Sequence, residues 1–186
     1  EAIAADVASL ALPLDRLTLG IGSGMAKQGA LARVTEAVSV LHEAGVPRVL
    51  VGALGPKMRR TGVELAEGVL LNWVPPIEAR NQAEVLHAIA PDAHIAVYVR
   101  TAIAPAARKR LEAEIARYAS FPNYAANFER MGVDAADTTI RDVTELGDAL
   151  EAYTAAADEV VLRAIVAEDT VEAYVDFARR TAPSPR

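Results

Sequence analysis

The sequence predicts an α/β fold in which parallel strands are covered by helices, as an open sheet or as a closed barrel. Short runs of apolar, often β-branched residues alternate with longer stretches of helical periodicity, which is the pattern of repeated strand–helix units. The strand runs are apolar almost without a break, so both faces of the sheet should be buried. No linker or low-complexity segment divides the chain, so a single domain over residues 1–186 is predicted.

Three strand–helix units follow an opening helix over Glu1–Leu12, whose pattern is already that of a helix interior. We therefore expect the natural start of the protein to lie upstream. One helix begins with Pro56, which suits a first helical position because the N–H that proline lacks would have no partner there. In chain order the predicted elements are strand Arg16–Gly22, helix Ala30–Ala44, strand Arg48–Leu54, helix Pro56–Ala66, strand Gly68–Val74 and helix Pro76–Ala90.

The second half of the chain predicts two more strands, separated by a longer helical region. The charges between Arg108 and Arg117 are typical of a solvated helix face, and Gly132 should end the helix that follows. The predicted elements are strand His94–Ala102, helices Pro105–Ala119, Asn123–Met131 and Leu146–Ala156, strand Glu159–Val166 and helix Thr170–Arg180, with a loose tail over residues 182–186.

The composition excludes several classes of function. A net charge of −6 and a pI near 5.1 argue against a nucleic-acid partner. The absence of cysteine excludes disulfides and a cysteine nucleophile, and His42, His87 and His94 form no recognisable metal-ligand pair, so no metal is expected. No apolar run reaches the roughly 20 residues of a membrane helix and no signal peptide opens the chain, so we expect a cytoplasmic protein without a membrane partner.

The loops after the strands hold the candidate site residues, because parallel α/β folds bind ligands at the carboxyl ends of their strands. The first loop offers Gly22, Ser23 and Gly24. Its backbone N–H groups and the Ser23 hydroxyl could approach a phosphate, whereas a tight turn would explain the glycines equally well. The run differs from the dinucleotide fingerprint GxGxxG because Met25 replaces the third glycine.

The second candidate is the loop after Arg48–Leu54, where small residues lead into the first turn of a helix. The N–H groups and the positive dipole end of that helix face the loop. Lys57 adds a full positive charge there, and the positive end of the helix dipole would repel this charge unless an anion lies nearby. We therefore favour a phosphate site over a structural turn. Its predicted contacts are Gly52, Ala53, Leu54, Gly55, Pro56 and Lys57.

The third candidate is Asn72 with Trp73, a polar amide and the only tryptophan at the end of an apolar strand. They would contact a ligand, or Trp73 would cover the end of the barrel. Arg100 and Thr101 end the next strand. Arg163 interrupts the apolar run of the last strand, where we expect either an ion pair or a substrate contact. A group of aromatic residues with near-helical spacing should serve packing: Tyr118, Phe121, Tyr124 and Phe128.

Three runs together resemble the luciferase-like flavin-dependent oxidoreductases. They are ASLALPLDRLTLGIGSG, RVLVGALGPKM and LAEGVLLNWV, in this order, and GALGPKM with LAEGVLLNW is the most specific part. The resemblance covers nearly the whole chain and points to the branch, found in actinobacteria, that uses the deazaflavin coenzyme F420.

This resemblance implies a (β/α)8 TIM barrel of the bacterial luciferase-like type, with Arg16–Gly22 as its fourth strand and Glu159–Val166 as its eighth. The cofactor phosphate would be held by the loops at Gly22–Gly24 and Gly52–Lys57, with Asn72 and Trp73 beside the cofactor. The implied function is an oxidoreductase that transfers a hydride between reduced F420 and a small organic substrate. FMN-dependent monooxygenation is the alternative, and because the family commonly forms dimers, a homodimer is expected.

The chain departs from the family in lacking the first three strands, which carry much of the ring contact and usually the residues proposed for catalysis. No catalytic residue is therefore assigned. A degenerate, non-catalytic barrel that acts as a binding or structural protein stays open as an alternative. A doubly wound sheet that binds NAD at the first loop is another, and it would place Arg16–Gly22 beside Gly68–Val74.

Overall fold

The computed structural model describes residues 2–10, 12–24 and 28–182. Its strands are β1 (Leu19–Ile21), β2 (Val49–Gly52), β3 (Gly68–Asn72), β4 (His94–Thr101) and β5 (Glu159–Ala164). Its α-helices are α1 (Ala2–Ser9), α2 (Ala30–Glu43), α3 (Pro56–Leu65), α4 (Pro76–His87), α5 (Arg108–Ala119), α6 (Pro122–Met131), α7 (Leu146–Thr154) and α8 (Val171–Thr181). Short 3₁₀ turns lie at Leu14–Arg16, Pro105–Ala107, Ala135–Thr138 and Val143–Glu145.

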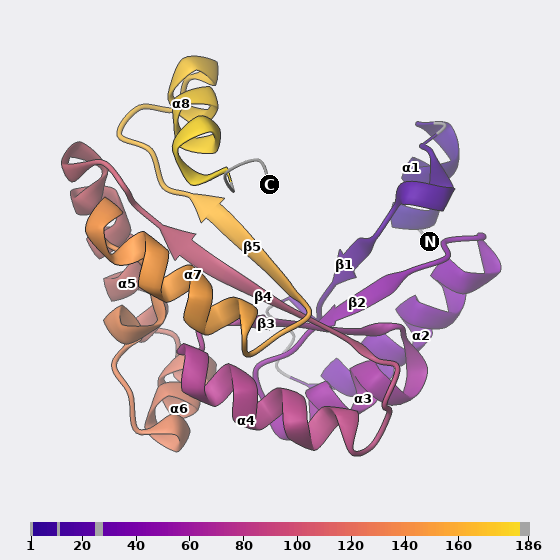
Figure 1. Cartoon of the computed structure of the whole chain (residues 1–186). Coiled ribbons are helices and arrows are strands. Elements are labelled where there is room, and N and C mark those ends of the chain that lie inside the picture. Colours follow the sequence, from indigo (N-terminus) through magenta and orange to yellow (C-terminus); the bar gives the residue numbers. More distant parts are fainter. Residues whose placement is uncertain (1, 11, 25–27, 183–186) are drawn as a thin grey trace. The chain divides into compact units, whose positions relative to one another are not determined.

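The fold is α/β, as predicted, with a parallel sheet whose strands follow the order of the sequence, β1-β2-β3-β4-β5 (Figure 1). A barrel requires this sequential order, whereas a doubly wound sheet reverses its strand order at a switch point. Since β1 pairs with β2 and not with β3, the doubly wound alternative is wrong.

The strand predicted over Arg16–Gly22 is too long at its start. Leu14–Arg16 instead form a 3₁₀ turn after Pro13, in which the Arg16 N–H donates to the Pro13 carbonyl oxygen at 3.0 Å. Only Leu19–Ile21 pair with β2. The expected tail at 182–186 lies outside the described residues from 183 onward, as do Glu1 and Ala11 of the predicted opening helix.

The chain divides into two compact units. The first unit holds residues 1–72 and 82–96, and the second holds residues 73–81 and 97–186. Both β4 and α4 contribute residues to each unit.

The first unit buries α2 against the strands. Val34, Val38 and Leu41 recur at the spacing of one helix face and are all buried. They meet Val49 and Val51 of β2 in one core cluster. The apolar periodicity of the sequence therefore predicts this face correctly.

Two glycines allow helix and strands of the first unit to approach closely. A Cβ atom on Gly62 of α3 would lie 2.6 Å from Val69 Cγ1 and 3.0 Å from Val51 Cβ. A Cβ atom on Gly68 would collide with the carbonyl oxygen of His94. Both positions thus need glycine for space.

The second unit has a core between α5 and the segment after β5. Ala102, Ala107, Leu111 and Ile165 are buried together there, and the Ile165 N–H donates to the Thr101 carbonyl oxygen at 2.9 Å. In α7 the buried Tyr153 hydroxyl donates to the Val74 carbonyl oxygen at 2.9 Å. Burial raises the pKa of Tyr153, so this hydroxyl keeps its proton and remains a donor at neutral pH.

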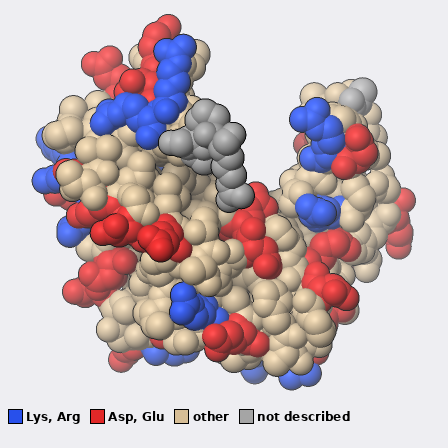
Figure 2. Space-filling view, in the orientation of Figure 1, with Lys and Arg blue, Asp and Glu red and all other residues tan. Residues whose placement is uncertain are grey.

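Charged side chains of both signs are interspersed on the face shown in Figure 2, where Lys and Arg occur in small groups separated by acidic residues. In the described part of the chain, no helix is both long and apolar enough to cross a membrane.

Candidate functional site

The loops after β1 and β2 lie side by side in the first unit. Ile21 pairs with Val51 in the sheet register. A Cβ atom on Gly52 would lie 3.3 Å from the Ile21 carbonyl oxygen, and one on Gly22 would lie 3.9 Å from the Gly52 carbonyl oxygen. The structure therefore brings together the two glycines that the sequence assigned to two separate phosphate-binding loops.

The loop after β1 is accessible. Gly22 and Gly24 are exposed, and Ser23 is half-buried. Gly24 has φ +59°, a left-handed conformation that side-chain-bearing residues rarely adopt. Gly24 therefore lies in a turn, whereas a phosphate contact at this loop stays a prediction. Met25 lies outside the described residues.

The first turn of α3 has no side-chain cap. Gly55 is the N-cap residue, in extended conformation, and Pro56 is the first helical residue. A helix start leaves backbone N–H groups without partners in the helix, and Gly55 has no side chain to accept from them. Lys57 is exposed and, among the described residues, forms no ion pair. The dipole and the lysine together make this end of α3 electropositive.

Arg59 also braces this loop, and the apolar pattern of the sequence does not indicate it. Its Nη1 donates to the Leu54 carbonyl oxygen at 2.6 Å, and its backbone N–H donates to the Gly55 carbonyl oxygen at 3.1 Å. The side chain thus braces the segment between β2 and α3. The sequence does contain a sign of this contact, because Arg59 is a second cation near the start of the helix, two residues after Lys57.

Asn72 and Trp73, which the sequence treats as a pair, belong to different units. Asn72 ends β3 in the first unit and is half-buried. It lies at the same strand edge as the two loops, because Gly52 pairs with Leu70 and the Ala53 N–H donates to the Leu70 carbonyl oxygen at 3.3 Å. Trp73 begins the second unit.

Trp73 is the centre of an aromatic cluster. Its ring lies 4.9 Å from that of Tyr118 and 6.0 Å from that of Phe128, and Tyr118 also contacts Phe121 and Tyr124. The packing function predicted for these aromatic residues is confirmed. Burial raises the pKa of Tyr124, with the neighbouring Tyr118 as the second cause.

The backbone of Trp73 is strained. Its φ of +56° is the only positive φ of a non-glycine residue in the described chain, and the side chain is 1% exposed. Its indole N–H has no hydrogen-bond acceptor in the structure as described. Residues with strained backbone often lie at functional sites in proteins, and a buried donor without an acceptor calls for an explanation. Trp73 is thus buried in packing contacts, and both the covering of a barrel end and a ligand contact through its N–H stay predictions.

Arg100 covers Trp73 and joins an ion-pair network. Its Cζ lies 3.9 Å from the Trp73 ring centroid, and its Nε lies 2.9 Å from Glu114 Oε2. Arg163 reaches the same carboxylate, with Nη2 at 2.6 Å from Oε1 and Nη1 at 3.1 Å from Oε2. The ion pair that was one of two explanations for Arg163 is confirmed.

Glu114 corrects the prediction that all charges between Arg108 and Arg117 are solvated. It is half-buried and shared by two arginines, of which Arg100 is 3% exposed. Two arginines within apolar strands indicate a carboxylate partner, but the sequence does not reveal which acidic residue supplies it.

No group of three or more metal-ligating side chains occurs among the residues that were placed. No protein-family model matches the sequence, and no curated protein matches it either. The family resemblance therefore rests on the sequence runs themselves, and the strand order agrees with the barrel they imply.

Proposed function

We propose that this chain contributes the last five strands of a luciferase-like barrel and holds the phosphate of coenzyme F420, or alternatively of FMN, between the loops Gly22–Gly24 and Gly52–Lys57. The observation that supports this best is that Gly22 and Gly52 lie close together, near an uncapped start of α3. Two loops with little side-chain bulk leave their backbone N–H groups accessible to the same ligand.

The phosphate would receive three kinds of stabilisation from this chain. The first turn of α3 supplies backbone N–H groups and the positive dipole end. The Ser23 hydroxyl supplies a donor, and Lys57 supplies a full charge that has no partner among the described residues. Hydrogen bonds to a charged phosphate are about twice as strong as those between neutral groups, so a few of them suffice to anchor a cofactor.

The cofactor would supply hydride transfer, while the protein binds and orients it. The function we propose is hydride transfer between reduced F420 and a small organic substrate, with FMN-dependent monooxygenation as the alternative. Asn72 lies at the same strand edge as both loops and would contact the cofactor beyond its phosphate.

Fluorescence titration of the protein with F420 and with FMN tests the proposal. We expect at least one cofactor to bind with a Kd of tens of micromolar or lower, about −6 to −8 kcal/mol. Lys57→Ala should weaken binding about tenfold, because it removes one charge-assisted contact. Arg60→Ala is the control, since it removes the same charge from the next turn of α3, where Arg60 pairs with Glu64, and it should leave affinity unchanged. Failure of the folded protein to bind either cofactor would contradict the proposal and favour the non-catalytic alternative.

A further inference from the structure

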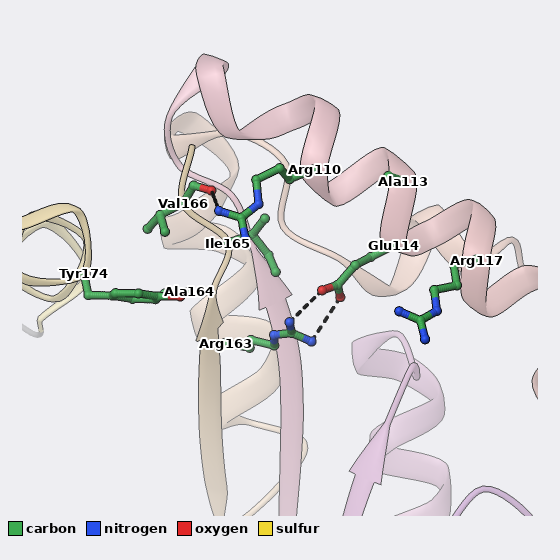
Figure 3. A pocket seen from close by; sticks show the side chains of 9 residues that line it. All are labelled: Arg110, Ala113, Glu114, Arg117, Arg163, Ala164, Ile165, Val166 and Tyr174. Carbon is green, nitrogen blue, oxygen red and sulfur yellow. Dashed lines mark hydrogen bonds and ion pairs between the residues drawn. The ribbon is translucent and has the colours of Figure 1, made fainter. Parts of the chain in front are cut away.

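The second unit contains a cavity of about 280 Å³ that the proposed cofactor site does not use (Figure 3). It lies against α5, the end of β5 and α8. Apolar lining comes from Ile165 and Val166. Its polar lining consists of Arg110, Arg117 and Arg163 with Glu114 and Tyr174.

Arginines outnumber carboxylates in the lining of this cavity, and two of the arginines, Arg110 and Arg117, are exposed. Glu114 is shared by Arg163 in the wall and Arg100 behind it. Arg110 donates to the Val166 carbonyl oxygen at 2.8 Å, which satisfies one N–H but leaves the charge. Arg117 forms no ion pair with any described residue. Three guanidinium groups and one carboxylate thus line the cavity, and a second carboxylate, Asp169, lies against the Tyr174 hydroxyl in its wall.

The helix geometry directs these groups to the same place. Arg110, Glu114 and Arg117 are separated by four and then three residues, so they share one face of α5. Figure 3 shows their side chains extending from α5 on the side of Arg163. The nearby Tyr174 hydroxyl donates to Asp169 at 2.8 Å and so is already occupied. Like charges in the lining of one cavity repel one another, and an oxyanion between them would relieve that repulsion.

We propose that this cavity binds a small organic molecule through a phosphate or carboxylate group held by Arg117, Arg163 and Arg110. The volume exceeds that of a bare ion and approaches the lower range of small-molecule pockets, and Ile165 with Val166 provides an apolar wall for the rest of the molecule. This site lies within the second unit and is independent of the phosphate site proposed for the first.

Binding is tested on the whole chain without flavin, by calorimetric titration at constant ionic strength. The probes are glycerol 3-phosphate, succinate, and glycerol as the neutral counterpart. We expect saturable binding of at least one anion and none of glycerol, and the preferred anion distinguishes an organic phosphate from an organic carboxylate as the ligand class. Saturable binding of glycerol with equal affinity, or of neither anion, would overturn the proposal.

Substitutions locate the bound anion. Arg117→Gln should weaken binding about tenfold, the size expected for one charge-assisted hydrogen bond, and it breaks no ion pair in the fold. Lys109→Gln makes the same change of charge on the same helix outside the cavity lining, and it should leave affinity unchanged. Equal losses in both variants would show a general charge effect and would contradict a site at Arg117.

Discussion

At the scale of single residues, a buried arginine of the second unit stacks on an aromatic ring and forms an ion pair at the same time. Arg100 lies over the Trp73 ring and donates to Glu114, with only 3% of its side chain exposed. A planar guanidinium can stack and donate at the same time, which a lysine ammonium cannot do. The side chain is therefore specified by shape as well as by charge.

Arg100→Lys should lower the free energy of unfolding by about 1–3 kcal/mol, because it weakens a charge-assisted hydrogen bond and removes the stack. Urea unfolding followed by the emission of Trp73 measures this directly. Arg108→Lys is the control, because Arg108 pairs with Asp142 at the surface and such pairs contribute about 0–1 kcal/mol. Equal destabilisation by the two variants would show that stacking and burial of Arg100 contribute nothing.

Asp142 provides a prediction about pH. The Thr144 backbone N–H, and then the Thr144 hydroxyl, hold the pKa of this carboxyl below its ordinary value. Its contribution to stability is thus complete above the unfolded pKa of about 3.9 and is lost as the pH falls through the lower folded pKa. NMR titration should show a midpoint below the ordinary value. Thr144→Ala should raise that midpoint only part of the way, since the backbone donor remains; full recovery would make the hydroxyl the main cause.

At the scale of elements, the sequence predicts nearly all helices and strands, because apolar periodicity records which face is buried. It misplaces the start of β1, since a 3₁₀ turn after Pro13 competes with the strand and leaves no mark on the apolar pattern. It predicts the loops at Gly22 and Gly52 from their place after strands. It does not predict the partners of Glu114, which lie 14 and 49 residues away in the chain, because long-range pairing depends on packing.

Gly62 tests how closely α3 approaches the strands. Alanine favours helix over glycine by about 1 kcal/mol, but a Cβ atom at Gly62 would lie 2.6 Å from Val69 Cγ1. We expect Gly62→Ala to be destabilising overall, by about 1–3 kcal/mol, because overpacking outweighs propensity. In α7, Gly147→Ala meets nothing within 4 Å and should be stabilising by up to about 1 kcal/mol. Stabilisation by both variants in thermal unfolding would contradict the close contact.

At the scale of the whole molecule, the order of the strands connects the fold with the proposed function. Sequential parallel pairing places the ends of β1 and β2 next to each other, so loops about 30 residues apart in the sequence can bind one ligand. An order in which β1 and β2 were not neighbours would have separated them. The phosphate site thus depends on topology as much as on the glycines and Lys57.

The most direct test of the phosphate site compares cofactors with and without their phosphate. FMN and riboflavin differ only in this group, and the deazaflavin chromophore of F420 can be compared in the same way with its own phosphate ester. We expect the phosphorylated member of at least one pair to bind at least about tenfold more tightly, which is the effect of one or more charge-assisted hydrogen bonds. Lys57→Ala should reduce this difference in affinity between the two members of the pair. Equal affinities within both pairs, with Lys57→Ala binding as the unmodified protein does, would contradict a phosphate site at these loops.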